Sequence, residues 1–174
     1  MKKSVLLIAL MMPMALFAQG EIKENNTFET FSSSIGELVK VVDYNMPKLK
    51  ADPVSAKVTV RKVTNAISSS SQCYLQINGS LIAYEDVVEL AKVLEQLKTL
   101  AEKDRIGDAN YLKTQFKTKD GLILGYYIEF AFGYEVTTWY ICLDGHDSSK
   151  LYFKSAEPLL ETFNKAINKI KGIQ

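Results

Sequence analysis

His146 is the only histidine of this 174-residue chain, and it lies among other reactive groups in the stretch Asp144-Gly-His-Asp-Ser-Ser149. An imidazole beside carboxylates and hydroxyls suits a weak cation site or a base–nucleophile pair. The same composition is typical of a polar turn, and we interpret the stretch primarily as a turn between sheet and helix. A single histidine also argues against a histidine-rich metal site, so we expect no metal.

Glu129 is the only acidic residue inside the most apolar predicted strand, residues 121–131. If its face of the sheet is covered, burial would raise its pKa and suit it to be the general acid of a periplasmic hydrolase. We favour the simpler alternative of an exposed or hydrogen-bonded structural carboxylate. A hydrolase that relies on Glu129 or His146 is therefore the alternative hypothesis, and a non-catalytic protein is the leading one.

Sequence motifs that would assign a specific chemistry are absent. The chain contains no CxxC, HExxH or GxSxG, and Gly121-Leu-Ile-Leu-Gly125 lies inside a predicted strand instead of a phosphate-binding loop. Charge is balanced, with 21 basic and 20 acidic residues and no block of one sign. The basic surface of a nucleic-acid binder is therefore not expected, and neither is a cofactor.

Aromatic residues suggest where a binding surface lies. Many of them crowd into residues 126–153, including Tyr126, Tyr127, Tyr134, Trp139, Tyr140, Tyr152 and Phe153. Most are expected in the core, but Tyr127 and Tyr140 have the strand parity of Ile123 and should line a second face. Tyrosine is enriched where a surface meets a partner or ligand. We predict a ligand- or partner-binding surface formed by Tyr127, Tyr140, Ile123, Tyr134 and His146.

The occupant of this surface is left open by the sequence. It is a protein partner, a second copy of the chain in a homodimer, or a small apolar or sugar ligand in an aromatic cleft.

The predicted hairpin of residues 121–143 is apolar on both faces, so both faces must be covered. Asp120-Gly121 is a tight-turn signal that joins it to a preceding strand, residues 110–118. Further strands are predicted at residues 56–64 and 71–77. Residues 27–44 are either a hairpin turning near Ile35-Gly36, which we favour because of the β-branched valines, or a helix.

Two amphipathic helices are predicted. Residues 84–103 carry an apolar stripe at three- and four-residue steps, and a second helix follows Ser155 as its cap and ends at Gly172. The fold class is α+β, with an antiparallel sheet of about six or seven strands and both helices packed on one face. The pattern of strand, turn, short apolar segment and acidic helix occurs after residue 73 and again after residue 139, which suggests an internal duplication of a strands-then-helix unit.

The N-terminus has the layout of a signal peptide. A basic start at Lys2-Lys3 precedes an apolar run that ends in Ala18, too short to span a bilayer. We expect residues 1–18 to be removed, residues 19–26 to form a flexible tail and residues 27–174 to form one domain. The protein is then periplasmic or secreted, bacterial, and without a membrane segment after cleavage.

The two cysteines are predicted to be unpaired. Cys73 shares its strand face with Leu75, whereas Cys142 lies opposite Ile141. If both strands belong to one sheet, the thiols point to opposite sides, so we favour free thiols over a disulfide.

One segment carries a resemblance. The stretch IAYEDVVELAKVL, which begins at Ile82, resembles a segment common in uncharacterised small exported bacterial proteins. The resemblance implies an exported α+β domain and assigns no activity, cofactor or site residue.

Overall fold

The described chain runs twice through the same order of elements, four strands and then a helix. A computed structural model describes residues 38–145 and 149–174. The first half consists of β1 (Val39–Asn45), β2 (Val58–Asn65), β3 (Ser71–Ile77), β4 (Ser80–Ala83) and α2 (Tyr84–Ala101). The second half consists of β5 (Tyr111–Lys117), β6 (Ile123–Ala131), β7 (Tyr134–Cys142), β8 (Lys150–Phe153) and α3 (Glu157–Lys171).

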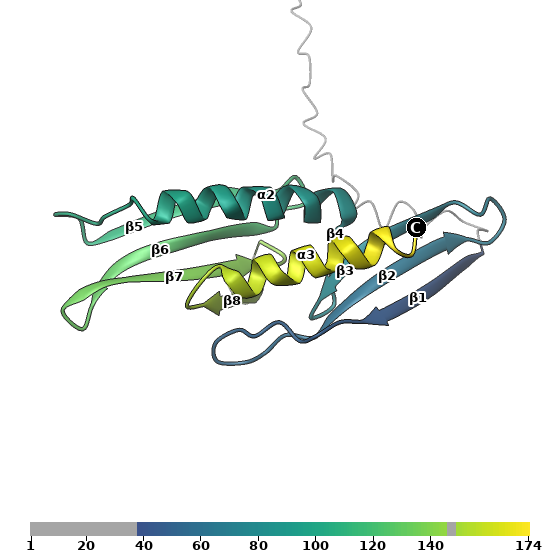
Figure 1. The fold of residues 1–174 in the computed structure, drawn as a ribbon, viewed down its shortest axis with the longest axis horizontal. Coiled ribbons are helices and arrows are strands. Elements are labelled where there is room, and N and C mark those ends of the chain that lie inside the picture. The colour runs from purple at the N-terminus through teal and green to yellow at the C-terminus, as the bar shows by residue number, and fades with distance from the viewer. Residues whose placement is uncertain (1–37, 146–148) are drawn as a thin grey trace, which may run out of the picture.

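The strands form two four-stranded antiparallel sheets, ordered β1-β2-β3-β4 and β5-β6-β7-β8. The α+β class is confirmed, but the prediction of one sheet of six or seven strands is wrong. Sequence reasoning missed β4 and β8, which at four residues each are too short to show an alternating pattern. Each completes a separate sheet, and Figure 1 shows the two sheets side by side along the length of the molecule.

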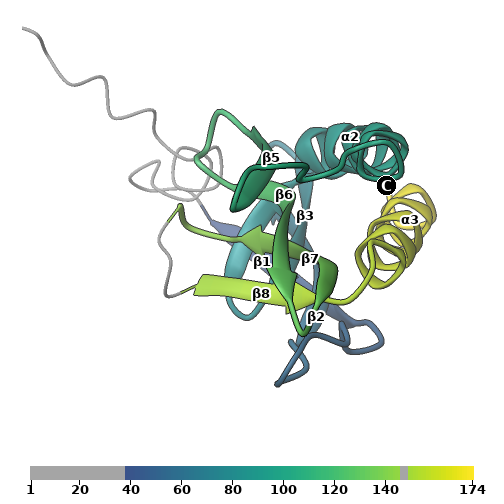
Figure 2. The same ribbon diagram turned by 90° about the vertical axis from the view of Figure 1, so that its left-hand side faces the viewer.

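Both helices lie on the same side of the strands, as predicted (Figure 2). The apolar stripe of α2, which includes Leu90 and Leu94, packs against β3, β4 and β6 and therefore touches both sheets. Helix α3 packs against α2 and β2, with Phe163 fully buried. One hydrophobic core thus joins the two halves. Apolar stripes at helical spacing identified both helices because each buries one continuous face.

The helix boundaries differ slightly from those predicted. Helix α2 ends at Ala101, and α3 begins at Glu157 with Ala156 in the N-cap position, so Ser155 is not the N-cap. Ser155 instead hydrogen-bonds to Glu157, and this bond is the main reason that the pKa of Glu157 is lowered. Gly172 ends α3, as predicted.

The predicted turn at Asp120-Gly121 is present, within a longer loop than expected. Gly121 has φ +87°, but β5 ends at Lys117 and β6 begins at Ile123. The Thr118 N–H donates to the Leu122 carbonyl across 2.9 Å and closes the loop. Glycine is favoured at position 121 because it adopts a positive φ without the steric cost that a side chain would bring.

Cys73 and Cys142 form no disulfide, as predicted; both thiols are buried, and they lie in different sheets. Cys73 belongs to the core beneath the helices, and Cys142 belongs to the opposite face of its sheet. Of the predicted 27–44 hairpin, the second part is strand β1, and the first part lies outside the described residues, as do the expected signal peptide and tail. Within residues 38–145 and 149–174, no helix is long and apolar enough to cross a membrane.

Candidate binding surface on the second sheet

The face of the second sheet that points away from the helices is here called the outer face. The alternate positions Leu124, Tyr126 and Ile128 of β6 belong to the core. The intervening positions therefore project outward. With their partners in register they form the outer face: Tyr111, Lys113, Gln115, Ile123, Gly125, Tyr127, Glu129, Tyr134, Val136, Thr138, Tyr140, Cys142, Lys150 and Tyr152.

Three tyrosines form a row across the outer face. The ring of Tyr127 lies 5.7 Å from that of Tyr111 and 6.3 Å from that of Tyr140, both in tilted geometry. Tyr111 is 51% exposed, Tyr127 is half-buried and Tyr140 is 2% exposed. Tyr127 and Tyr140 therefore share the outer face, as their parity predicts, but within this row only Tyr111 and Tyr127 are substantially exposed. Partial burial, and then the neighbouring Tyr127, raises the pKa of Tyr111.

Tyr140 is held in place by polar neighbours. Its hydroxyl donates to Gln115 Oε1 across 2.9 Å, and the Nζ atoms of Lys113 and Lys150 each lie 5.4 Å from its ring centroid. A cation over a tyrosine ring is a favourable contact. Tyr140 therefore forms the floor of the surface and positions two lysines around it.

A groove of about 740 Å³ opens beside this row. It is lined by Asp52, Pro53, Tyr127, Phe132, Tyr134, Val136, Thr137, Thr138, Tyr152, Phe153 and Lys154. Asp52 and Pro53 belong to the first half of the chain, and the Asp52 N–H donates to the Tyr152 carbonyl across 2.9 Å. The groove has aromatic walls and a few polar groups, which is the usual make-up of a binding cleft.

The groove exists because β8 is shorter than β7. Strand β8 pairs only with residues Trp139–Cys142, so residues 134–138 of β7 have β6 on one side and, within the described chain, no strand on the other. The two-residue hairpin closes at Ala131 and Tyr134, and backbone groups alternate in direction along an antiparallel strand. The N–H and C=O groups of Glu135 and Thr137 consequently point toward the groove.

The β6–β7 turn adds an exposed aromatic tip, at the far left of Figure 1. Phe130, Phe132 and Tyr134 are 65%, 92% and 59% exposed. Phe132 also has φ +55°, which is unfavourable for a bulky side chain and would suit asparagine or glycine better. Within the described residues, the Phe132 ring therefore gains almost no burial that would offset its strained backbone position.

The structure places the other predicted site residues as follows. Ile123 is half-buried at the base of the outer face, opposite Cys142 in register, and Tyr134 lines the groove. Glu129 is exposed beside Tyr111, so the burial that would have suited it to general-acid catalysis is not met. His146 lies outside the described residues.

Several groove residues were missed by sequence reasoning. Phe132 carried a usable signal, since phenylalanine is unusual before glycine in a two-residue hairpin turn. Asp52 and Pro53 carried none, because only the tertiary fold brings the β1–β2 connection beside β8.

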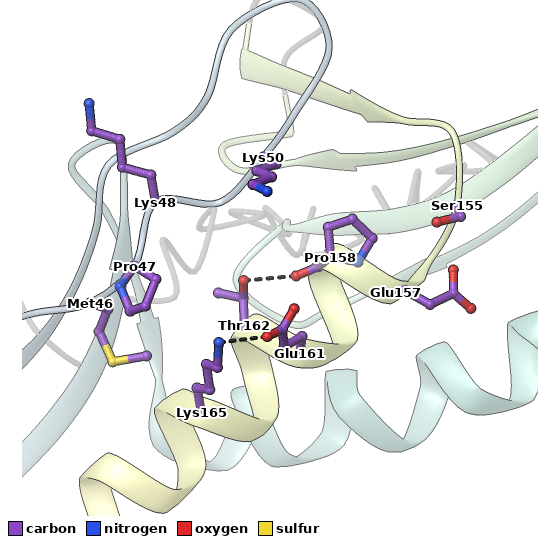
Figure 3. Close-up of a pocket in the computed structure, with 10 residues that line it drawn as sticks. All are labelled: Met46, Pro47, Lys48, Lys50, Ser155, Glu157, Pro158, Glu161, Thr162 and Lys165. Carbon is purple, nitrogen blue, oxygen red and sulfur yellow. Dashed lines mark hydrogen bonds and ion pairs between the residues drawn. The ribbon is translucent and has the colours of Figure 1, made fainter.

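Two other cavities of about 450 Å³ are more polar in character. One lies at the start of α3 (Figure 3), where the Lys165 Nζ and Glu161 Oε1 atoms pair across 2.6 Å and the Thr162 hydroxyl donates to the Pro158 carbonyl. Lys48 and Lys50 also line this cavity.

The second of these cavities is bordered by Asp86, Asp120 and Asp144. Burial, followed by repulsion from Asp120, raises the pKa of Asp86. Among residues 38–145 and 149–174, no group of three or more side chains is arranged to hold a metal ion.

Comparison with known proteins gives no relative from which a function of this site could be inferred. No protein-family model matches the chain, and no curated protein matches it.

Proposed function

We propose that this protein is a non-catalytic binding module that takes up an extended polypeptide segment along the open edge of β7. The observation that carries the proposal is the edge of residues 134–138, which no strand of the described chain pairs with, at the wall of an aromatic groove. An extended segment placed there would continue the line of β8 and accept the backbone hydrogen bonds that β8 is too short to make. Addition of a strand to a sheet edge is a common mode of peptide recognition.

The side chains around this edge would supply most of the selectivity. Tyr134, Val136 and Thr138 project on the outer face, and Tyr127 and Tyr152 flank them. Alternate side chains of a bound strand would therefore meet tyrosine rings, which favour apolar and aromatic partners. Each backbone hydrogen bond contributes only about 0.5–1.5 kcal/mol net, so aromatic contacts are needed for useful affinity.

We also propose that the protein acts outside the cytoplasm, in the periplasm or the surrounding medium. This proposal rests on the signal-peptide layout of residues 1–18.

A small apolar or sugar ligand is the second candidate occupant. The volume of the groove falls within the range of small-molecule sites, and Asp52, Thr138 and Lys154 supply hydrogen-bonding groups. The open strand edge favours the peptide, because a small ligand has no use for a row of backbone groups.

Selection from a peptide library tests the proposal. A random dodecapeptide library displayed on phage is panned against the full mature chain, and enriched peptides are titrated by fluorescence anisotropy. We expect enriched peptides to lose at least about tenfold in affinity for Thr137→Pro, which removes an N–H that points into the groove. Lys48→Glu, at the cavity of Figure 3, is the control and should bind them as the wild type does.

Enrichment of no peptide, or peptides that bind Thr137→Pro and wild type alike, would count against a polypeptide site. Binding of soluble oligosaccharides or of a hydrophobic dye that Tyr134→Ser abolishes would instead support the small-ligand alternative.

A further inference from the structure

The open edge of β7, residues 134–138, has the aromatic tip at one end and the end of β8, with Phe153 and Lys154, at the other. These two ends lie too far apart to contact each other within one copy, but they could meet between two copies. Phe132 at the tip is almost fully exposed, and Tyr152 and Pro53 line the far end of the groove.

We propose that the occupant of the open β7 edge is the same edge of a second copy of this chain, paired antiparallel about a two-fold axis near Val136. The inference rests on the proposed function, because it names the polypeptide that the edge binds. In a two-fold interface each surface meets itself, so the edge must be self-complementary.

The lengths of the elements fit this arrangement. Strand β8 ends opposite Trp139, and the β6–β7 turn is two residues long. Pairing centred near Val136 therefore brings the tip of each copy up to the end of β8 in the other. Phe132 of one copy then meets the apolar end of the groove in the other, formed by Pro53, Tyr152 and Phe153. This contact would explain why a phenylalanine occupies a strained, exposed turn position.

The charges fit as well. Glu129 is exposed on the outer face of β6, opposite Val136 in register, and Lys154 is exposed just beyond the end of β8 at the groove. Two-fold pairing near Val136 brings Lys154 of each copy beside the strand that carries Glu129 in the other, in both directions at once. Such complementarity orients an interface and disfavours the parallel arrangement, which would bring like charges together.

Sedimentation velocity of the full mature chain between about 1 μM and about 1 mM tests the inference. We expect a concentration-dependent dimer in the wild type. Thr137→Pro and Phe132→Asn should each weaken it at least about tenfold while circular dichroism shows a folded protein. Glu129→Lys and Lys154→Glu should each weaken self-association, and an equimolar mixture of the two should restore dimers. Lys48→Glu makes the same charge change away from the edge and should dimerise as the wild type does.

A wild type that stays monomeric over the whole range would overturn the inference, and so would failure of the two charge variants to restore each other. If Thr137→Pro fails to fold, amide hydrogen exchange of the wild type tests the interface instead. Protection of residues 134–138 that rises with concentration supports the interface, and protection confined to other surfaces overturns it. If the protein is monomeric but its β7 edge still binds library peptides, this inference is wrong and the proposed function is still supported.

Discussion

The phenol of Tyr126 donates a hydrogen bond to Asp104 Oδ2 across 2.5 Å and so ties the centre of the second sheet to the loop after α2. The Tyr126 ring is fully buried and lies 5.0 Å from that of Trp139. Burial, and then the bond to Asp104, raises the pKa of Tyr126. Removal of the hydroxyl leaves a carboxylate without its strongest donor.

Tyr126→Phe should therefore lower the free energy of unfolding by about 1.5–3 kcal/mol, the range for a hydrogen bond to a charged group. Urea denaturation monitored by Trp139 fluorescence measures the loss. Thr114→Val removes the weaker 3.4 Å contact to the same oxygen and is the control. Equal losses in the two variants would contradict the special role of the tyrosine.

Gly125→Ala should destabilise the second sheet, because β5 approaches β6 closely at this position. A Cβ atom there would lie 2.3 Å from the Thr114 carbonyl oxygen and 2.8 Å from Gln115 Cα. Overpacking against backbone atoms costs about 1–3 kcal/mol. Gly172→Ala is the matched control, since its Cβ would meet its nearest neighbours at an ordinary 3.6 Å. In thermal unfolding, Gly125→Ala should melt at a clearly lower temperature than Gly172→Ala. A melting temperature of Gly125→Ala equal to that of the wild type would refute the close approach.

Phe132→Asn should stabilise the monomer. Asparagine tolerates the φ of +55° that phenylalanine resists, and relief of such strain contributes about 0.5–1 kcal/mol. At a protein concentration low enough for the wild type to be monomeric, the melting temperature should rise. Phe130→Asn removes a comparably exposed ring from a strand position without positive φ and should bring no gain. Stabilisation combined with loss of self-association would show that Phe132 is retained for binding.

Asp86→Asn should stabilise the protein at neutral pH and lose this advantage in acid. Burial and the neighbouring Asp120 raise the pKa of Asp86, so the folded state holds its proton more tightly than the unfolded state does. The ionised carboxylate therefore destabilises the fold above its raised pKa, and this cost disappears as pH falls below the ordinary value of 3.8.

Asp43 provides a control of opposite sign. Its paired bonds to Arg61, at 2.7 and 2.8 Å, lower its pKa. Its stabilising effect is present above pH 3.8 and is lost as pH falls through the lowered pKa. Asp43→Asn should therefore weaken the protein modestly at neutral pH, because the pair is partly exposed. Urea denaturation across a pH series tests both variants.

Much of the candidate site could be anticipated from local pattern, and part of it could not. The parity of β6 predicted that Tyr127 leaves the core face, and the structure places it beside Tyr140 as expected. Strand parity does not predict how accessible a side chain is to solvent, however, so it did not reveal that Tyr140 is buried while Tyr111 is exposed. Burial depends on every segment that passes over a face, and those segments are distant in sequence.

What the sequence determined by itself is the set of elements and the face that each presents. The apolar stripe of residues 84–101 and the alternation in residues 123–131 are local properties, because a helix and a strand impose their own periods on neighbouring residues. Tertiary structure alone decided that the strands divide into two sheets and that Asp52 lies against Tyr152. It also ended β8 opposite Trp139, so that residues 134–138 of β7 have no strand on that side within the part of the chain that the structure describes. These features depend on strand pairing between segments far apart in the chain, where the relative length of two neighbouring strands sets which backbone groups go unpaired.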